Sequence, residues 1–351
     1  MRLDPIRKAQ AIVSREFQAL YPAPKTLLSP VPPGQFRHSK LRHLKRLVGR
    51  WLFPMLQRRN RRLSGLSSVE WAQMITIDHR FLQDWVRREL ANHLGTQTGL
   101  RVLIPGTHFN TAEARIWFSQ PGASVKMLDI VDWRPSFETA EPTLRAWYPA
   151  DLGMIHGSLD RLPVANDCMD VVESCSVLEH VGNMEKAVSE MARVTKPGGY
   201  GIHDFGPLYY SYGGDHAIAA YGWQHGYDHL LLDEEEYQHR LLDESYFKSL
   251  GMEAYNSRYW ATRGIFSYLK PLDYLRLFQR HFEVVACGVN VSEEALLFRS
   301  RHYGKWKLLQ EAGVDEETLL VSNISILVRK LNSLSCHRRA EETSGVRSAL
   351  F

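Results

Sequence analysis

The chain has 351 residues, 44% of them hydrophobic and 23% charged, which is the composition of an ordinary globular protein that buries a full core. It contains no run of about 18 apolar residues, which argues against a membrane-spanning helix, and its first residues lack the apolar stretch of a secretory signal. The four cysteines form no CxxC pair, so we expect neither disulfides nor a structural zinc site, and a reducing, cytoplasmic compartment is favoured.

The net charge of +4 is distributed unevenly along the chain. From Phe17 to Val69 there are 11 Lys and Arg residues and no Asp or Glu, whereas the rest of the chain carries 32 basic residues against 39 acidic ones. The sequence therefore predicts a mildly acidic body preceded by a basic N-terminal extension, residues 1–67. Within this extension, residues 1–20 are expected to form a helix and the proline-rich stretch "YPAPKTLLSPVPPGQ" an irregular linker.

A basic amphipathic segment at residues 37–62 belongs to the extension. Its leucines stand beside arginines and lysines, and it contains Trp51 and Phe53. Two interpretations stay open for its apolar face. Either the face covers the main domain, or it lies on an anionic membrane surface, which would make the protein peripheral at the inner face of a membrane. No nucleic-acid partner is expected.

The body of the chain alternates helical and strand patterns. A helix is expected at residues 68–93. Strands are expected at residues 100–106, 123–130, 154–156, 169–175, 200–205, 281–291 and 319–331. A long aromatic and histidine-rich region at about 206–270 interrupts this series and is expected to be an insertion between strands. The polar tail, residues 333–351, is expected to be disordered.

The most readable part of the chain is a strand–helix–strand unit in residues 169–205. Asn183 is a suitable N-cap for its helix, and Pro197-Gly198-Gly199 marks the helix end. Helical spacing predicts one buried face, formed by Met184, Ala187, Val188, Met191, Ala192 and Thr195. Such a unit is a crossover between parallel strands, and it predicts an α/β fold with helices on the faces of a parallel sheet.

Four segments in this region, in this order, resemble the second half of the class I S-adenosylmethionine-dependent methyltransferases of the type 11-like group: "LP" with its acidic turn, "MDVV", "VLEHV" and "ARVTKPGG". The resemblance implies a doubly wound, Rossmann-like, seven-stranded methyltransferase sheet over residues 68–332, with the insertion late in the sheet. It also implies S-adenosylmethionine as cofactor. One fold hosts many chemistries, so the resemblance says much less about the substrate.

The loop after the first strand departs from the family pattern. Members of the family usually show an acidic residue followed by three alternating glycines, which let the backbone approach the cofactor. Here the loop reads "VLIPGTHFN". Gly106 matches the first glycine, while His108 and Asn110 occupy the places of the next two, and Ile104 replaces the acid. The resemblance thus implies a cofactor loop with a degenerate glycine pattern.

Asp129 is the expected partner of the cofactor's ribose. It ends the second strand and lies 23 residues after Gly106, near the spacing at which a carboxylate accepts hydrogen bonds from two ribose hydroxyls. Asp132 is a close competitor for this role. A loop or helix-cap acid is the alternative interpretation of Asp129.

Further cofactor contacts are implied at the ends of two later strands. Ser158 stands where family members usually carry an Asp that accepts from the adenine amino group, and the backbone of Leu159 follows it. Ser174 and Cys175 end the strand that would lie beside the cofactor, where packing is an equally good explanation for small residues. Asp160 is expected to be an acidic residue on the protein surface.

Methylation of a hydroxyl benefits from a base that removes its proton. The candidates are His180, His203, His216 and Asp215, with His216 beside Asp215 as first choice. Glu179 with His180 and the acids and histidines of the insertion suggest a divalent metal site. Neighbours in sequence seldom ligate one ion together, however, so no metal site is predicted.

The insertion contains many tyrosines interleaved with histidines and acids, a mixture that suits sugar rings. It also resembles a segment of methyltransferases from bacterial surface-polysaccharide clusters. The sequence therefore predicts an O-methyltransferase acting on a small-molecule or glycan substrate, such as a surface-polysaccharide intermediate. The alternative is a non-catalytic binding or scaffold protein that has lost cofactor binding. No GxGxxG follows the first strand, which argues against a dehydrogenase.

Overall fold

The computed structural model describes residues 25–29, 80–107, 109, 111–217, 223–243 and 261–331. The basic segment at residues 37–62, the first part of the helix expected at 68–93 and the tail at 333–351 lie outside these ranges. Within the described ranges, no helix is both long enough and apolar enough to cross a membrane.

The chain divides into two compact units, a sheet unit and an insertion unit. The sheet unit contains the described residues of 85–204, 274–287 and 325–351. The insertion unit contains those of 1–84, 205–273 and 288–324, so it joins the predicted insertion to a helical segment near the C-terminus. The domain boundaries drawn from the sequence stay a prediction.

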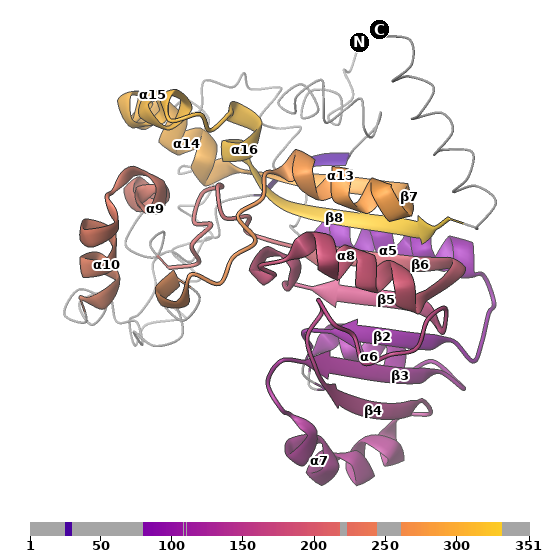
Figure 1. Cartoon of the computed structure of the whole chain (residues 1–351). Coiled ribbons are helices and arrows are strands. Elements are labelled where there is room, and N and C mark those ends of the chain that lie inside the picture. Colours follow the sequence, from indigo (N-terminus) through magenta and orange to yellow (C-terminus); the bar gives the residue numbers. More distant parts are fainter. Residues whose placement is uncertain are drawn as a thin grey trace, which may run out of the picture. The chain divides into compact units, whose positions relative to one another are not determined.

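One mixed sheet holds all the described strands, in the order β1-β7-β8-β6-β5-β2-β3-β4 (Figure 1). The strands are β1 (Lys25–Ser29), β2 (Arg101–Pro105), β3 (Ser124–Asp129), β4 (Asp151–His156), β5 (Met169–Cys175), β6 (Thr195–Phe205), β7 (Phe282–Ser292) and β8 (Val321–Lys330). The last seven are the strands expected from the sequence. β8 runs against β5, whereas β2 pairs in parallel with both β3 and β5 (Figure 1).

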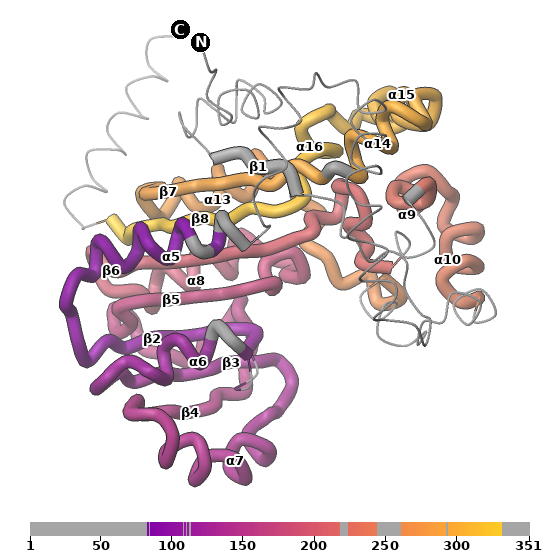
Figure 2. Tube along the Cα trace, turned by 180° about the vertical axis from the view of Figure 1, so that it is seen from behind, coloured from indigo at the N-terminus to yellow at the C-terminus, as the bar shows by residue number. Residues whose placement is uncertain are grey.

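Helices cover both faces of the sheet. The crossover helix α8 (Met184–Val194) lies on one face, and α5 (Arg80–Leu94) lies on the other, as the two opposite views show (Figures 1 and 2). Three further elements of the sheet region are α6 (Ala112–Phe118), α7 (Arg134–Trp147) and α13 (Pro271–His281). This arrangement confirms the predicted doubly wound α/β fold. The strand β1 adds to it and corrects the expectation of an irregular linker, because Lys25–Ser29 lies within "YPAPKTLLSPVPPGQ" and pairs in parallel with β7, from Lys25 opposite Gly288 to Ser29 opposite Ser292.

The predicted crossover is confirmed in detail. The side chain of Asn183 accepts a hydrogen bond from the Lys186 N–H at 3.0 Å, which caps α8. All six residues of the predicted apolar face are buried: Met184, Ala187, Val188, Met191, Ala192 and Thr195. The helix ends at Val194, ahead of the Pro-Gly-Gly stretch, and the chain enters β6 directly.

The insertion unit is mainly helical in its described part. Its helices are η3 (Trp223–His225), α9 (Asp228–Leu231), α10 (Glu234–Leu242), α14 (Glu293–Arg301), α15 (Tyr303–Glu311) and α16 (Glu316–Leu320). Their apolar core includes Tyr212, Tyr227 and Trp306. The Tyr227 hydroxyl donates to the Leu319 carbonyl at 2.5 Å, which ties α9 to α16.

A buried carboxylate ties helices to the centre of the sheet. Glu173 lies in β5 with 1% of its surface exposed and forms an ion pair with Arg87 of α5. Trp117 of α6 donates to the same carboxylate through its indole N–H at 2.5 Å. A charge removed from water in this way needs its partners, because the low dielectric of the interior penalises an unpaired ion.

We expect Arg87→Ala to lower the free energy of unfolding by about 3 kcal/mol, because it leaves the buried Glu173 carboxylate without its cation. Urea unfolding monitored by circular dichroism measures the loss. The control is Arg134→Ala, which removes an ion pair with Asp132 that is exposed on both sides. We expect the control to unfold at the wild-type urea concentration. Equal effects of the two variants would contradict this account of Glu173.

Candidate functional site

The tight turn after β2 requires the glycine that the sequence predicted. Gly106 has a φ of +68°, and its N–H donates to the Leu128 carbonyl at 2.6 Å. A Cβ at this position would lie 2.7 Å from Cγ1 of Val177 and closer still to Cγ2. The turn therefore packs against the segment that follows β5, and any larger residue would force the two apart. His108 and Asn110 lie outside the described residues, while Phe109 is buried in the core and packs edge-on against Phe137 at 5.8 Å.

Asp129 and Asp132, the two acids expected as partner of the cofactor's ribose, differ in their surroundings. Asp132 forms an ion pair with Arg134 at 2.6 Å, and this hydrogen-bonded partner lowers the pKa of Asp132 to about 2. Asp129 ends β3, and its Oδ1 accepts from the Val131 N–H at 2.8 Å. Within the described part of the chain, no hydrogen bond is made by its Oδ2. Asp129 thus retains the acceptor capacity that a pair of hydroxyls needs.

The loop after β3 exposes two apolar side chains that sequence reasoning missed. Ile130 and Val131 are 62% and 46% exposed, directly after Asp129. The loop is fastened to β4, because His156 donates through Nε2 to the Ile130 carbonyl at 3.1 Å and Gly157 N–H donates to the Asp129 carbonyl at 2.9 Å. In the sequence, the signal for this exposed surface was the presence of two β-branched residues, Ile130 and Val131, at a position where a polar turn is usual. Such exposed apolar surface beside a polar acceptor suits a flat, partly apolar ring.

Three of the other predicted cofactor residues lie near the ends of β4 and β5. Ser158 is half-buried, and its carbonyl accepts from the Arg161 N–H at 3.2 Å. Leu159 is buried, and Cys175 is half-buried at the end of β5. Their proposed contacts with a cofactor stay predictions.

Ser174 and His203 are core residues, which corrects their assignment to the site. Ser174 is 1% exposed and its Oγ lies 2.8 Å from Nδ1 of His203. His203 is fully buried and stacks on Phe278 with ring centroids 5.1 Å apart. Burial lowers the pKa of His203 to about 3, so the imidazole is neutral at ordinary pH. Side chains enclosed in this way reach neither a cofactor nor an acceptor, and we do not retain them as site residues.

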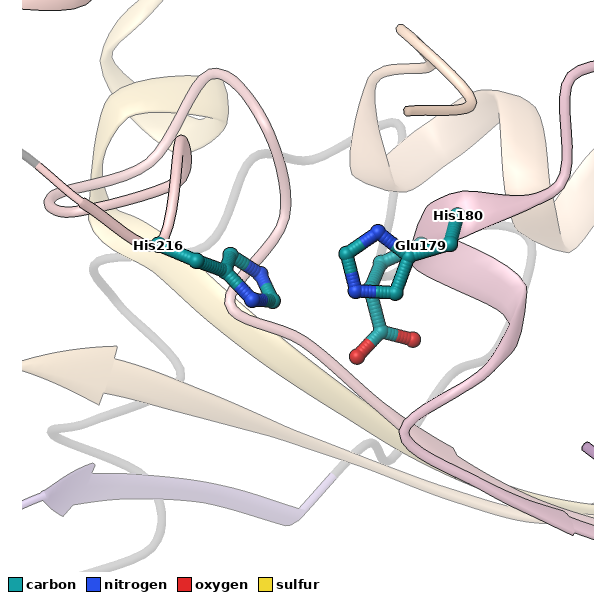
Figure 3. Close-up of side chains that lie close together, drawn as sticks. All are labelled: Glu179, His180 and His216. Carbon is teal, nitrogen blue, oxygen red and sulfur yellow. The ribbon is translucent and has the colours of Figure 1, made fainter. Parts of the chain in front are cut away.

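Figure 3 shows two of the remaining base candidates, His180 and His216, together with Glu179. In the sheet unit, the short helix η1 (Leu178–His180) follows β5 and carries the buried Glu179 and the half-buried His180. In the insertion unit, His216 lies in a loop with a φ of +61°. A non-glycine residue in this left-handed region is strained, and such strain is common at functional sites.

The surroundings of His216 fix its tautomer. Nε2 lies 3.2 Å from the Pro207 carbonyl, and since a carbonyl only accepts, Nε2 carries the proton. A neutral His216 therefore has its lone pair on Nδ1. Burial lowers its pKa, which favours this neutral form. The neighbouring Asp215 is fully buried and accepts from the Tyr237 hydroxyl at 3.0 Å and from the Ala217 N–H at 3.2 Å.

Some of the described tyrosines of the insertion are core residues, whereas others form a cluster. Tyr212 and Tyr227 are buried in the core of the unit. What forms instead is a compact tyrosine cluster, in which Tyr209 contacts all the other rings: Tyr210, His229, Phe266 and Tyr268. Tyr268 is 44% exposed. Aromatic faces of this kind, with one side reachable from water, suit the apolar face of a sugar ring.

The carboxyl edge of β2 and β3 fits the adenosine part of S-adenosylmethionine. Asp129 offers carboxylate oxygen to the ribose, and Ile130 and Val131 offer apolar surface to the adenine, whereas Gly106 allows the turn after β2 to pack against Val177. Ile104, at the position of the family's acid, is fully buried in β2. The ammonium group of the cofactor is therefore not recognised from that position.

Gly106→Ala is expected to lower the free energy of unfolding by about 3 kcal/mol, because the new methyl group meets Val177 and the backbone keeps a positive φ. Gly95→Ala is the matched control. Gly95 has a φ of +58° but no atom within 4 Å of a built Cβ, so it isolates the backbone cost of about 1 kcal/mol. Thermal or urea unfolding measures both. Equal losses of unfolding free energy in Gly106→Ala and Gly95→Ala would show that the turn is not in close contact with Val177.

The buried His203 makes stability depend on pH. Its pKa falls from 6.5 to about 3 on folding, so between these values the unfolded chain binds one more proton than the folded one. Stability is therefore complete above pH 6.5 and decreases as the pH falls toward 3. We expect wild-type stability to fall more steeply than that of His203→Gln, by up to about 1.4 kcal/mol per pH unit. Ser174→Ala keeps the imidazole buried and should retain the steep dependence. Urea unfolding from pH 4 to 7 measures the slopes, and parallel curves for wild type and His203→Gln would refute the assignment.

Comparisons with known proteins agree with the fold. Residues 114–202 match a family described as a methyltransferase domain. The chain is 36% identical over 91 residues to an uncharacterized methyltransferase of Mycobacterium avium, which covers 22% of this chain and 36% of that protein. It is 38% identical over 78 residues to one of Mycobacterium bovis, covering 19% and 30% respectively. The chain thus spans about a third of the length of the curated relatives it matches.

Among solved structures, a phosphoethanolamine N-methyltransferase of Haemonchus contortus in complex with S-adenosyl-L-methionine is similar over 71% of this chain and 53% of that one, with 15% identity and a TM-score of 0.41. Apart from the added β1, the strand order β7-β8-β6-β5-β2-β3-β4, with β8 reversed, is the order of the class I methyltransferase sheet. The chain therefore carries a methyltransferase domain with the class I fold, as its sequence motifs predicted.

Proposed function

We propose that the chain is an S-adenosylmethionine-dependent methyltransferase that methylates a hydroxyl of a sugar or surface-polysaccharide intermediate. The observation that carries the proposal is the position of Gly106 and Asp129 at the carboxyl ends of the adjacent parallel strands β2 and β3, next to and within the residues 114–202 that match a methyltransferase domain. Methyltransferases of this class use S-adenosylmethionine, which supplies a methyl group bound to a sulfonium.

The chain's own residues would act on this donor by holding it. The Gly106 turn, packed on Val177, holds the end of β2 in place, and Asp129 would accept hydrogen bonds from the ribose hydroxyls through the oxygen that its loop leaves available. Ile130 and Val131 would remove the adenine ring from water. Because orientation supplies a large part of the rate of an in-line transfer, a rigidly fastened loop is an advantage here. The bonds from His156 and Gly157 provide that rigidity.

On the acceptor side, His216 stays the first candidate for the base. Its Nε2–H is held by the Pro207 carbonyl, and burial favours the neutral ring, which is the form in which an imidazole acts as a base. His180 is the other candidate. The tyrosine cluster supports a sugar as the acceptor, because Tyr268 and its neighbours offer aromatic faces beside polar atoms. Membrane contact through residues 37–62 is part of the proposal and lies outside the described residues.

A second candidate function is a binding or scaffold protein with this fold and no catalysis. The burial of Ile104 where relatives carry an acid favours it, since one contact with the methionine end of the cofactor is missing. The retained glycine turn and Asp129 favour the enzyme. Cofactor binding decides between the two.

Calorimetric titration with S-adenosylmethionine and S-adenosylhomocysteine tests the proposal. We expect micromolar binding by the wild type and a loss of at least about tenfold in Asp129→Ala, since hydrogen bonds to a charged acceptor contribute about 1.5–3 kcal/mol. Asp132→Ala is the matched control, because this acid lies three residues away and pairs with Arg134. The control should bind like the wild type. If folded wild-type protein gives no binding heat at millimolar ligand, the proposal of an enzyme is overturned and the scaffold function remains.

A further inference from the structure

The connection between β4 and β5, residues 157–168, borders the proposed donor site in the sheet unit. Its first residue, Gly157, donates through its N–H to the Asp129 carbonyl at 2.9 Å. A β-bridge between Ser158 and Arg161 then closes a tight turn, in which the Arg161 N–H donates to the Ser158 carbonyl at 3.2 Å. The connection therefore begins on the loop that carries the proposed ribose acceptor.

The later part of this connection is held by Arg193 of α8. Its guanidinium donates to three acceptors there: the Leu162 carbonyl at 2.9 Å, the Val164 carbonyl at 2.8 Å and Oδ1 of Asn166 at 2.7 Å. The backbone of Arg193 contributes as well, because its carbonyl accepts from the Asp167 N–H at 2.9 Å. One residue thus fixes the path by which the chain returns to β5.

Glu190, one turn earlier in α8, completes this arrangement. Its carboxylate accepts from Nε and Nη2 of Arg193, both at 2.7 Å, and from the Leu162 N–H at 2.8 Å. The hydrogen bonds from Arg193 lower the pKa of Glu190, so the carboxylate stays ionised beside the guanidinium. All five N–H donors of Arg193 are used in this way. A lysine carries its three donors on one nitrogen and could not reach these separated acceptors.

The two parts of the connection also pack on each other. A Cβ built on Gly157 would lie 3.1 Å from Cδ of Pro163, so the start of the connection cannot move without its later part. Asp129 holds the connection at one end and Arg193 holds it at the other. The Ser158 turn between these two attachments is therefore kept in one position relative to the proposed ribose acceptor.

We propose that Arg193 is a positioning residue for the methyl donor, because it holds the Ser158 turn beside the Asp129 loop and thereby sets how well the adenine fits. Arg193 itself would not touch the donor, since its N–H groups are used within the chain. The inference rests on the proposed function, because it needs a donor bound at Asp129. The alternative is a purely structural arginine, whose loss lowers stability and leaves the preference for adenine unchanged.

Amide hydrogen exchange of the full chain without ligand is the first measurement. The test variant is Arg193→Lys, which keeps the charge and removes the separated donors. Arg280→Lys is the matched control, because Arg280 pairs with Glu185 near the start of α8 and both side chains are more than half exposed. We expect faster exchange in residues 157–168 of Arg193→Lys and wild-type exchange there in the control. Equal exchange in all three proteins would overturn the inference, whether or not the donor binds.

Calorimetric titration with S-adenosylhomocysteine and with S-inosylhomocysteine, which carries hypoxanthine in place of adenine, measures the positioning itself. Each variant is titrated at a temperature at which circular dichroism shows it folded. We expect the wild type and Arg280→Lys to prefer the adenine compound roughly tenfold. Arg193→Lys should bind it roughly tenfold more weakly and lose most of the preference.

The ratio of the two dissociation constants separates the inference from the proposed function. If the wild type binds the adenine compound and the ratio is the same in Arg193→Lys, the inference is overturned and the proposed function stands. If the folded wild type binds neither compound at millimolar concentration, the proposed function fails and Arg193 has no donor to position. Faster exchange in residues 157–168 would then identify Arg193 as a structural residue only.

Discussion

The parallel pairing of β2 with β3 and β5 is the constraint on which the candidate site depends. Parallel strands end at the same edge of a sheet, so the turns that follow them meet there although they are distant in sequence. Gly106 after β2 packs against Val177 after β5, and the loop that starts at Asp129 is fastened to the end of β4. The buried ion pair of Glu173 with Arg87 fixes β5 to the helix layer behind it. A shift of β5 would therefore disturb both the core and the turn.

The features predicted correctly from the sequence are those that depend on local spacing. Asn183 and the apolar face of α8 follow from positions three and four residues apart, and the strands follow from short apolar runs. Gly106 was predicted from its place after a strand. That this position requires a glycine is shown only by its close contact with Val177, which lies far along the chain. Local patterns report the elements of the fold, whereas steric limits between distant segments appear only in three dimensions.

The histidines show why the site was harder to predict than the fold. His203 and His216 both stand beside acids in the sequence, yet the first is sealed between Ser174 and Phe278 and the second lies in a strained loop. A strand alternates its side chains between two faces, and burial on one face depends on the helix that covers it, which the strand's own sequence does not show. Ile130 presents the reverse case, because the sequence placed it in the strand expected at 123–130, whereas the strand ends at Asp129 and the chain exposes both Ile130 and Val131.

Recognition of the acceptor is best sought in the insertion unit, because the sheet of this fold serves many different substrates. The sheet unit holds the groups that suit the shared donor, Gly106 and Asp129, and these are set by the turns after parallel strands. The insertion unit holds the tyrosine cluster, whose aromatic faces suit an acceptor. This cluster includes His229 of α9, whose Nε2 lies 2.7 Å from the Tyr209 carbonyl, whereas the preceding residue Asp228 pairs with Arg240. Substitutions in α9 should therefore change which acceptor is bound while donor binding persists, a separation that a site built on one set of loops would not allow.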